Sequence, residues 1–268
     1  MVKLRSLLLL LSTAMLLVPL QAAQAAAAPA VSPKFLQKVL HLNGPVTILQ
    51  TRPGPAGLTA ALISTGGRKG IVWIVGNDSA VAVGDVRSAK GEDLTKQMAI
   101  RMGLVPKPIK PAAVAKAVSG LDTFMVGSKG AEITVFVDPN CIFCHELYLH
   151  AQPLVRAGTL RLRVVMVGFL KPSSLAKAAA ILMRSDHAQA LASDETTFDV
   201  THEEGGIKPA KAIPPAIKQA IHANNRLLLR SGEEATPTLL YQDNEGHWQI
   251  MHHLPDHGFA PILAQMKK

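Results

Sequence analysis

The only two cysteines among the 268 residues, Cys141 and Cys144, are separated by Ile142 and Phe143. A disulfide between them would close a very short loop, which restricts the unfolded chain far less than a long loop does. Small proteins that depend on disulfides are usually rich in cysteine, and this chain is neither small nor rich in cysteine. The pair is therefore better explained by reactivity, in which one thiolate attacks a disulfide and a second thiol resolves the product.

The residues around the pair predict how the two thiols are positioned. Residues 133–137 form a predicted strand with apolar side chains on both faces, which indicates a central strand covered on both sides. Asp138-Pro139-Asn140 ends that strand, and a helical pattern follows over residues 141–155. Residues three apart share one face of a helix, so both sulfurs can meet. N–H groups without intrahelical partners and the helix dipole favour a thiolate in the first turn, so Cys141 is the expected nucleophile and Cys144 the resolving thiol.

His145 extends the motif to Cys-x-x-Cys-His, which is also the attachment signature of c-type haem. An electron-carrying haem protein is therefore an alternative interpretation. The apolar strand before the motif favours a sheet-based domain instead, and the chain has no second such motif. Under the redox interpretation, His145 lies one helical turn beyond Cys141, where it either tunes the charge of that thiol or faces solvent.

Zinc is a third interpretation, because Cys141, Cys144 and His145 are three potential ligands at close spacing. A closed structural zinc site needs four ligands, and no fourth is near in the sequence. Three histidines near the C-terminus are more typical of surface positions than of ligands, namely His252, His253 and His257. We therefore expect neither a metal nor another cofactor.

The N-terminus has the pattern of a secretory signal peptide. Lys3 and Arg5 precede an apolar run over residues 7–20, and Ala23-Gln24-Ala25 is a typical cleavage site. The run is shorter than the roughly 20 residues that span a bilayer, so residues 1–25 are predicted to be removed on export. Cleavage lowers the formal net charge from +9 to +7, because two basic residues and no acid are lost. The lysines are scattered and aromatic residues are only 4% of the chain, which argues against nucleic-acid binding.

Residues 26–106 are predicted to form a small N-terminal α+β domain. It begins with a helical pattern and continues with three short strands and a closing helix, at residues 35–42, 58–64, 70–75, 80–86 and 92–102. So few elements bury little core for an independent monomer, and a second chain would supply the rest. Prolines at positions 106, 108 and 111 mark a boundary, and an alanine-rich linker helix is expected within residues 107–121.

Residues 122–268 are predicted to form the second domain. The strand before the cysteines, the helix after them and a strand over residues 160–169 make a strand-helix-strand unit of parallel type. The remaining expected elements are helices over 173–184, 215–230 and 258–266, and strands over 239–242 and 248–252 joined by a turn. Thr236-Pro237 stands just before strand 239–242, where a proline is permitted and is trans by default.

The ordered landmarks of the second domain resemble those of the DsbC and DsbG family of periplasmic thiol:disulfide interchange proteins, most closely its DsbG members. These landmarks are Val135 through Cys144, Val167-Gly168-Phe169-Leu170-Lys171-Pro172, Ala178 through Leu182, Thr236-Pro237 and Leu254-Pro255-Asp256. The resemblance covers the mature chain, weakly in the first domain and strongly in the second. Such an ordered set is far more specific than Cys-x-x-Cys alone.

The resemblance implies an α+β two-domain protein, in which an N-terminal dimerisation domain and a linker helix precede a thioredoxin-like α/β domain with a helical insertion. It implies that Cys141 and Cys144 are catalytic, that Pro237 is cis, and that Thr236 and Pro237 hold an extended client segment. It also implies a periplasmic homodimer that isomerises or reduces non-native disulfides, or sulfenylated cysteines, in exported proteins. The electron donor would be an inner-membrane protein of the DsbD type. A thiol oxidase on the same fold and a chaperone-like binding module are further alternatives.

This chain departs from the family pattern between the two cysteines. Members of the DsbG type usually have proline and tyrosine there, whereas this chain has Ile142 and Phe143. These two positions, together with His145, influence how well the thiolate is stabilised. The redox poise of the family is therefore not carried over to this chain.

Overall fold

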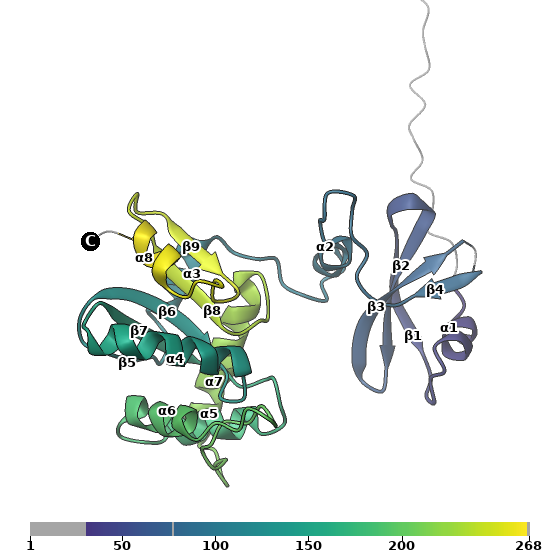
Figure 1. Cartoon of the computed structure of the whole chain (residues 1–268). Coiled ribbons are helices and arrows are strands. Elements are labelled where there is room, and N and C mark those ends of the chain that lie inside the picture. The colour runs from purple at the N-terminus through teal and green to yellow at the C-terminus, as the bar shows by residue number, and fades with distance from the viewer. Residues whose placement is uncertain (1–30, 77, 267–268) are drawn as a thin grey trace, which may run out of the picture. The chain divides into compact units, whose positions relative to one another are not determined.

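The computed structural model describes residues 31–76 and 78–266, and the chain divides into two compact units between Met102 and Gly103 (Figure 1). The predicted signal peptide, residues 1–25, lies outside the described residues. Within the described ranges, every helix is too short or too polar to cross a membrane.

The first unit is built on a four-stranded antiparallel meander with the strand order β1-β2-β3-β4. Its elements are α1 Pro33–Val39, β1 Thr47–Pro53, a 3-10 turn Pro55–Gly57, β2 Leu58–Thr65, β3 Arg68–Val75, β4 Ala80–Ala82 and α2 Leu94–Arg101. One face of the sheet packs against the fully buried Leu36 of α1. Alternation along β3 points Trp73 to the other face, where its indole N–H donates a hydrogen bond to Thr95 Oγ1 of α2 at 3.0 Å.

The sequence pattern predicts three strands in this unit, and the structure has four. β1 was missed because none of its residues is fully buried and its pairing with β2 shifts register between Ile48 and Gln50. Such a shift breaks the alternation of apolar and polar residues on which strand prediction depends. The last predicted strand is also shorter than expected, because β4 ends at Ala82 rather than near Val86.

The second unit is a five-stranded mixed sheet with the strand order β5-β7-β6-β8-β9. Its elements are α3 Pro111–Val118, β5 Phe124–Val126, β6 Ala131–Val137, α4 Ile142–Arg156, β7 Leu160–Met166, α5 Ser174–Leu182, α6 His187–Thr196, α7 Pro215–Ser231, β8 Thr238–Gln242, β9 Trp248–Met251 and α8 Ala260–Gln265. β6 and β7 are parallel, and β8 is antiparallel to both β6 and β9. A parallel βαβ unit joined to an antiparallel ββα unit at one central strand is the thioredoxin-like arrangement, as expected.

β6 is the central strand of the sheet, which confirms the prediction made from its two apolar faces. Ile133, Val135 and Val137 contribute to the same core cluster as Leu147 of α4. Phe136 contributes to a second cluster on the opposite face, with residues of α3 and α7. Helices therefore cover both faces, and the strand that leads to the cysteines is held rigidly.

The alanine-rich helix expected to link the two domains, α3, packs as part of the second unit. Val114 and Val118 are buried in the same cluster as Phe136. The backbone N–H of Ile109 donates a hydrogen bond to the carbonyl of Arg230 at the end of α7, at 2.9 Å. Apolar residues four positions apart give α3 a packing face, so residues 111–118 are not a free connector.

Candidate active site

Cys141 and Cys144 lie where β6 ends and α4 begins, and both are free thiols. Cys141 is the N-cap residue of α4, and its sulfur accepts a hydrogen bond from the backbone N–H of Cys144 at 3.2 Å. Only 4% of Cys141 is exposed, and Cys144 is completely buried. An N-cap sulfur that accepts a helix N–H is well placed to carry negative charge.

The two thiols differ in acidity. The pKa of Cys141 is lowered, chiefly by its hydrogen bond with the Cys144 side chain and also by Thr236, although burial acts in the opposite direction. The pKa of Cys144 is raised well above that of a free thiol, first by burial and then by its interactions with Cys141. Cys141 therefore ionises first, while Cys144 holds its proton.

The segment that precedes β8 lies against Cys141. The Cys141 thiol donates a hydrogen bond to the carbonyl oxygen of Thr236 at 3.3 Å, and the Thr236–Pro237 peptide bond is cis, as the resemblance implied. These residues meet because β8 pairs with the strand that leads to Cys141, with Phe136 opposite Thr238. The fold thus brings together all four residues that were predicted to form the centre.

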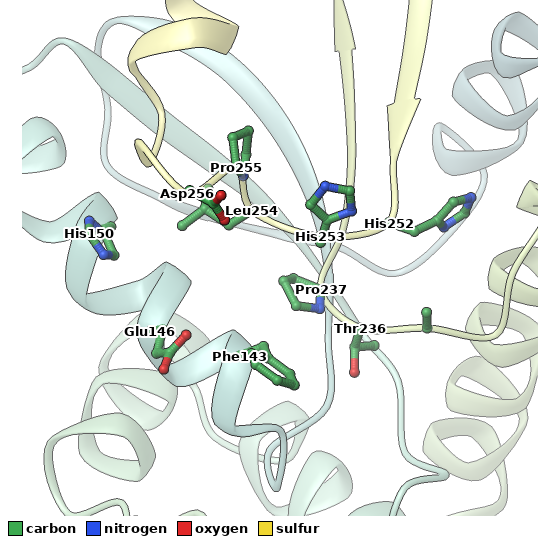
Figure 2. A pocket seen from close by; sticks show the side chains of 11 residues that line it. Phe143, Glu146, His150, Thr236, Pro237, His252, His253, Leu254, Pro255 and Asp256 are labelled. Atoms are coloured by element: carbon green, nitrogen blue, oxygen red, sulfur yellow. The ribbon is translucent and has the colours of Figure 1, made fainter.

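Two grooves with shared lining residues flank this centre, and Figure 2 shows the first of them. The first, of about 510 Å³, is lined by Phe143, Glu146, His150, Ala235, Thr236, Pro237 and residues 252–256. The second, of about 440 Å³, shares Phe143, Ala235 and Thr236 with the first and adds Asn140, Cys141, Ile142, Leu170, Lys171 and Glu203. Phe143 is 61% exposed and belongs to both grooves. Figure 2 shows the side chains of Glu146 on α4 and Asp256 on the loop after β9 on opposite sides of the first groove.

His145 is directed to neither groove. Its Nδ1 lies 2.9 Å from Glu195 Oε2, and its ring stacks on Phe198 with centroids 4.5 Å apart and planes at 11°. Only 12% of its side chain is exposed. The sequence left two options for His145, and the structure excludes the one in which its side chain faces solvent.

Glu195 was missed by sequence reasoning because α6, which carries it, was not predicted. The buried face of α6 includes Asp194 and Glu195 beside Ala190 and Leu191. A pattern method assigns acidic residues to the solvent face, so a helix that buries two carboxyl groups shows no apolar period. Asp194 and Glu195 also lie next to the polar loop that follows α6, so nothing else in the sequence marked them as buried.

Asp138 supports the turn that leads from β6 to Cys141. Its carboxylate is completely buried and accepts hydrogen bonds from three backbone N–H groups and one hydroxyl. The donors are Asn140 N at 3.0 Å, Phe169 N at 2.8 Å, Leu170 N at 3.1 Å and Ser174 Oγ at 2.7 Å. One carboxylate thus joins the active-site turn to the segment between β7 and α5.

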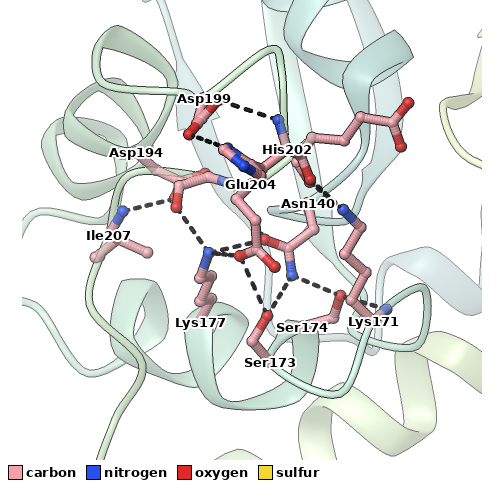
Figure 3. Close-up of polar contacts among 12 residues, drawn as sticks. Asn140, Lys171, Ser173, Ser174, Lys177, Asp194, Asp199, His202, Glu204 and Ile207 are labelled. Carbon is pink, nitrogen blue, oxygen red and sulfur yellow. Dashed lines mark hydrogen bonds and ion pairs between the residues drawn. The ribbon is translucent and has the colours of Figure 1, made fainter.

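Lys177 of α5 extends this support into the helical insertion (Figure 3). Its side chain is 6% exposed, and Nζ donates hydrogen bonds to Asn140 Oδ1 at 2.9 Å and to the carbonyl of Gly205 at 2.7 Å. It also forms an ion pair with Glu204. A Cβ at Gly205 would collide with the Asp194 carboxylate, so glycine is required for this close approach.

We expect Asp194 to make stability depend on pH. Burial raises its pKa from 3.8 to about 6, even though Lys177 and the N–H of Ile207 act to lower it. Between these two pH values the folded chain binds more protons than the unfolded chain, so stability falls as pH rises through this window and is constant above it. Asp194→Asn removes the effect. Between pH 4 and pH 7 the native protein should therefore lose about 2–3 kcal/mol of unfolding free energy that the variant does not lose. Urea denaturation at both pH values measures this difference, and a difference that does not change with pH would contradict the assignment.

The alternative ligands of the motif do not fit this geometry. Cys141 lines the second groove described above, whereas His145 lines a separate cavity with Tyr148 and Glu195, and Cys144 is completely buried. Haem attachment through Cys-x-x-Cys-His needs both thiols and the histidine around one haem, and these groups do not share a cavity. Among residues 31–76 and 78–266, no three histidine, cysteine, aspartate or glutamate side chains are placed to hold a metal ion.

Comparison with known proteins gives two curated relatives with the same description. The chain is 36% identical over 121 residues to the thiol:disulfide interchange protein DsbG of Pseudomonas aeruginosa, and the match spans 44% of each protein. It is 27% identical over 239 residues to DsbG of Escherichia coli, which covers 86% of this chain and 90% of the relative. No protein-family model matches the chain.

Solved structures with a similar arrangement include Helicobacter pylori DsbG, with 15% identity and a TM-score of 0.36 over 77% of this chain and 97% of that one. The catalytic domain of Proteus mirabilis ScsC matches 58% of this chain and 96% of its own, with 16% identity and a TM-score of 0.42. By these matches the chain is similar to thiol:disulfide interchange proteins of the DsbC/DsbG type.

Proposed function

We propose that this protein is a periplasmic thiol-disulfide oxidoreductase that reduces or isomerises non-native disulfides in exported proteins. Cys141 is the nucleophile and Cys144 the resolving thiol. The observation that supports this most directly is the placement of the more acidic thiol in a groove beside Thr236, with the less acidic thiol buried behind it.

The reaction begins when the Cys141 thiolate attacks one sulfur of a client disulfide. A bond forms between Cys141 and that client sulfur, and the other client sulfur leaves as a thiolate.

The mixed disulfide has two outcomes. In reduction, Cys144 attacks the Cys141 sulfur, the client is released with two thiols, and the protein holds the oxidised pair. In isomerisation, a client thiolate attacks instead, and Cys141 is released unchanged. A sulfenylated client cysteine would give the same mixed disulfide with loss of water.

The grooves supply the client site. An extended client segment would lie along Thr236 and Pro237, with Phe143 offering an exposed apolar contact at the boundary of the two grooves. Glu146 and Asp256 face the same groove, so clients with lysine or arginine near the target cysteine are favoured over acidic ones. Ile142 lines the second groove beside Cys141 and shapes access to the thiol.

The sequence and the first unit support a particular cellular setting. The predicted signal peptide supports export to the periplasm, where an inner-membrane donor of the DsbD type would return electrons to the oxidised pair. The first unit has a small core and an exposed edge strand β1 with Leu49 46% exposed. Both features support a homodimer formed through this unit, because a second copy would cover the open edge.

The test is to trap thiols with a maleimide reagent in intact cells and then to give the purified reduced protein a client with scrambled disulfides. We expect both cysteines to be reduced in the cell and the client to regain its native disulfides. A pair that is oxidised in the cell and passes its disulfide to reduced clients would identify a thiol oxidase instead. A protein that suppresses client aggregation equally well after both cysteines are replaced by serine would identify a binding module.

A further inference from the structure

The groove that contains the reactive thiol differs in chemistry from the groove beside it. Cys141 lines the second groove and not the first. A mixed disulfide tethers the client to the Cys141 sulfur, so the second groove holds at least one residue next to the client cysteine. The first groove has two carboxylates, Glu146 and Asp256, whereas the charged residues that line the second are one base and one acid, Lys171 and Glu203. The neighbour of the client cysteine therefore meets a surface without an excess of charge.

Most polar side chains of the second groove already have partners within the protein. Asn140 Oδ1 accepts hydrogen bonds from Lys177 Nζ at 2.9 Å and from the N–H of Gly205 at 3.1 Å, and its Nδ2 donates to two serine hydroxyls. The Lys171 ammonium donates to two backbone carbonyls. Thr236 is the exception, because its hydroxyl is buried without a hydrogen-bond partner among the described residues. A polar client side chain would lose water here and find few partners in exchange.

Two large apolar side chains are exposed in the same groove. Phe143 is 61% exposed and comes from α4, and Leu170 is 44% exposed and comes from the segment between β7 and α5. Ile142 also lines the groove. Single exposed apolar residues are common on protein surfaces, but these come from two separate segments and share the groove of the nucleophile. An apolar client side chain that covers them would remove their surface from water.

The backbone that carries Leu170 is fixed on both sides. Its N–H donates a hydrogen bond to Asp138 Oδ2 at 3.1 Å. The next residue, Lys171, reaches the helical insertion, where Nζ donates to the carbonyls of His202 and Glu203 at 2.6 and 2.7 Å (Figure 3). Glu203 has a φ of 49°, a left-handed conformation that residues other than glycine rarely adopt, so this turn depends on such support. Lys171 thus joins the two segments that form the wall of the groove opposite α4.

We propose that the second groove is a subsite for an apolar side chain next to the target cysteine of the client, and that Lys171 is the positioning residue that holds its wall. A fixed wall lowers the ordering cost of binding. This inference rests on the proposed function and names its client class, which is exported chains whose target cysteine has an aliphatic or aromatic neighbour. Such neighbours are usually buried in a folded protein, so the subsite selects cysteines that misfolding has exposed.

Peptides with one cysteine, blocked as a pyridyl disulfide, test the subsite. They carry leucine, serine or lysine beside that cysteine, in two sets that place this residue before it or after it. When the Cys141 thiolate attacks the peptide sulfur, a mixed disulfide forms and thiopyridone leaves, which stopped-flow absorbance follows. Each rate constant is divided by the rate constant of the same peptide with mercaptoethanol, which removes intrinsic reactivity. In one of the two sets we expect leucine to be favoured over serine and lysine by about tenfold.

Variants of the wall locate this preference. Leu170→Ala should reduce it to roughly threefold or less, because about half of the exposed apolar contact is lost. Lys171→Gln is too short to reach both carbonyls, so it should raise the half-saturating concentration of the leucine peptide several-fold and leave the saturating attack rate unchanged. Lys171→Arg restores the donors and should recover the native value. Attack on free dipyridyl disulfide, which has no side chain, should stay within about twofold in all three variants.

Leu149→Ala is the matched control. Leu149 is 54% exposed on α4, the helix that carries Phe143, but it lines the separate cavity of His145 and neither client groove. This variant should keep the native preference for leucine and the native rate with dipyridyl disulfide.

The outcomes separate the subsite from the proposed function. Equal normalised rates for the three peptides in both sets would overturn the subsite and leave Cys141 as the nucleophile. A full preference for leucine in Leu170→Ala would place the apolar contact elsewhere, and native binding of the leucine peptide by Lys171→Gln would overturn the positioning role. Native protein that releases no thiopyridone from any peptide or from dipyridyl disulfide would contradict the proposed function itself.

Discussion

Cys141→Ser is expected to abolish disulfide exchange, with a loss of roughly a thousandfold or more in the rate of client reduction. A serine hydroxyl does not ionise in the pH range where the Cys141 thiol, with its lowered pKa, forms a thiolate. The remaining thiol cannot compensate, because Cys144 is completely buried and its pKa is raised. The reduction of a disulfide-linked client by the variant, followed with a thiol reagent, measures this loss.

Cys144→Ser is the informative counterpart of that variant. Cys141 can still attack a client, but no second thiol is present to break the mixed disulfide. Cells that contain this variant should accumulate covalent complexes with clients, visible on non-reducing gels after acid quenching and removed by a reductant. The variant without both cysteines should show none. If either single variant kept full reductase activity, the assigned roles of the two thiols would be wrong.

Asp138→Ala is expected to have the largest effect on stability, lowering the unfolding free energy by about 3–5 kcal/mol. The substitution leaves four donors without their completely buried acceptor, and three of them are backbone N–H groups. A sequence pattern alone would treat this aspartate as an ordinary turn residue. Urea denaturation at neutral pH, with the slope checked for two-state behaviour, gives the difference.

Asp256→Ala is the control for that prediction, because this aspartate is exposed on the loop after β9 and its loss should change stability by less than about 0.5 kcal/mol. Asp138→Asn retains one acceptor oxygen. Its loss of unfolding free energy should therefore lie between the losses of Asp138→Ala and Asp256→Ala. The negative charge of Asp138 also raises the pKa of Cys141, so both substitutions should make that thiol slightly more acidic. An Asp138→Ala protein with an unchanged denaturation midpoint would show that the carboxylate does not hold the active-site turn.

Local sequence was sufficient for the central part of the site. The apolar strand, the Asp138-Pro139-Asn140 break and the helical pattern after it correctly predicted that the cysteines lie at the start of α4. These features depend on neighbouring residues, so a linear pattern contains them. The close approach of Thr236 to Cys141 is different, because 95 residues separate them and only the pairing of β8 with β6 brings them together. That approach was anticipated from the resemblance to a known family and not from the spacing.

The cysteine spacing and its position after a buried strand were thus determined by the sequence itself, because both are properties of a short continuous segment. The helix start already favoured Cys141 as the thiolate, and the tertiary structure added the complete burial of Cys144 and the contact of Cys141 with Thr236, which precedes β8. Only the tertiary structure placed Glu195 beside His145, because α6 buries two carboxyl groups and has no apolar period by which it could be recognised. Charge and burial at this site are set by segments far apart in the chain, and a linear pattern contains no information on how such segments meet.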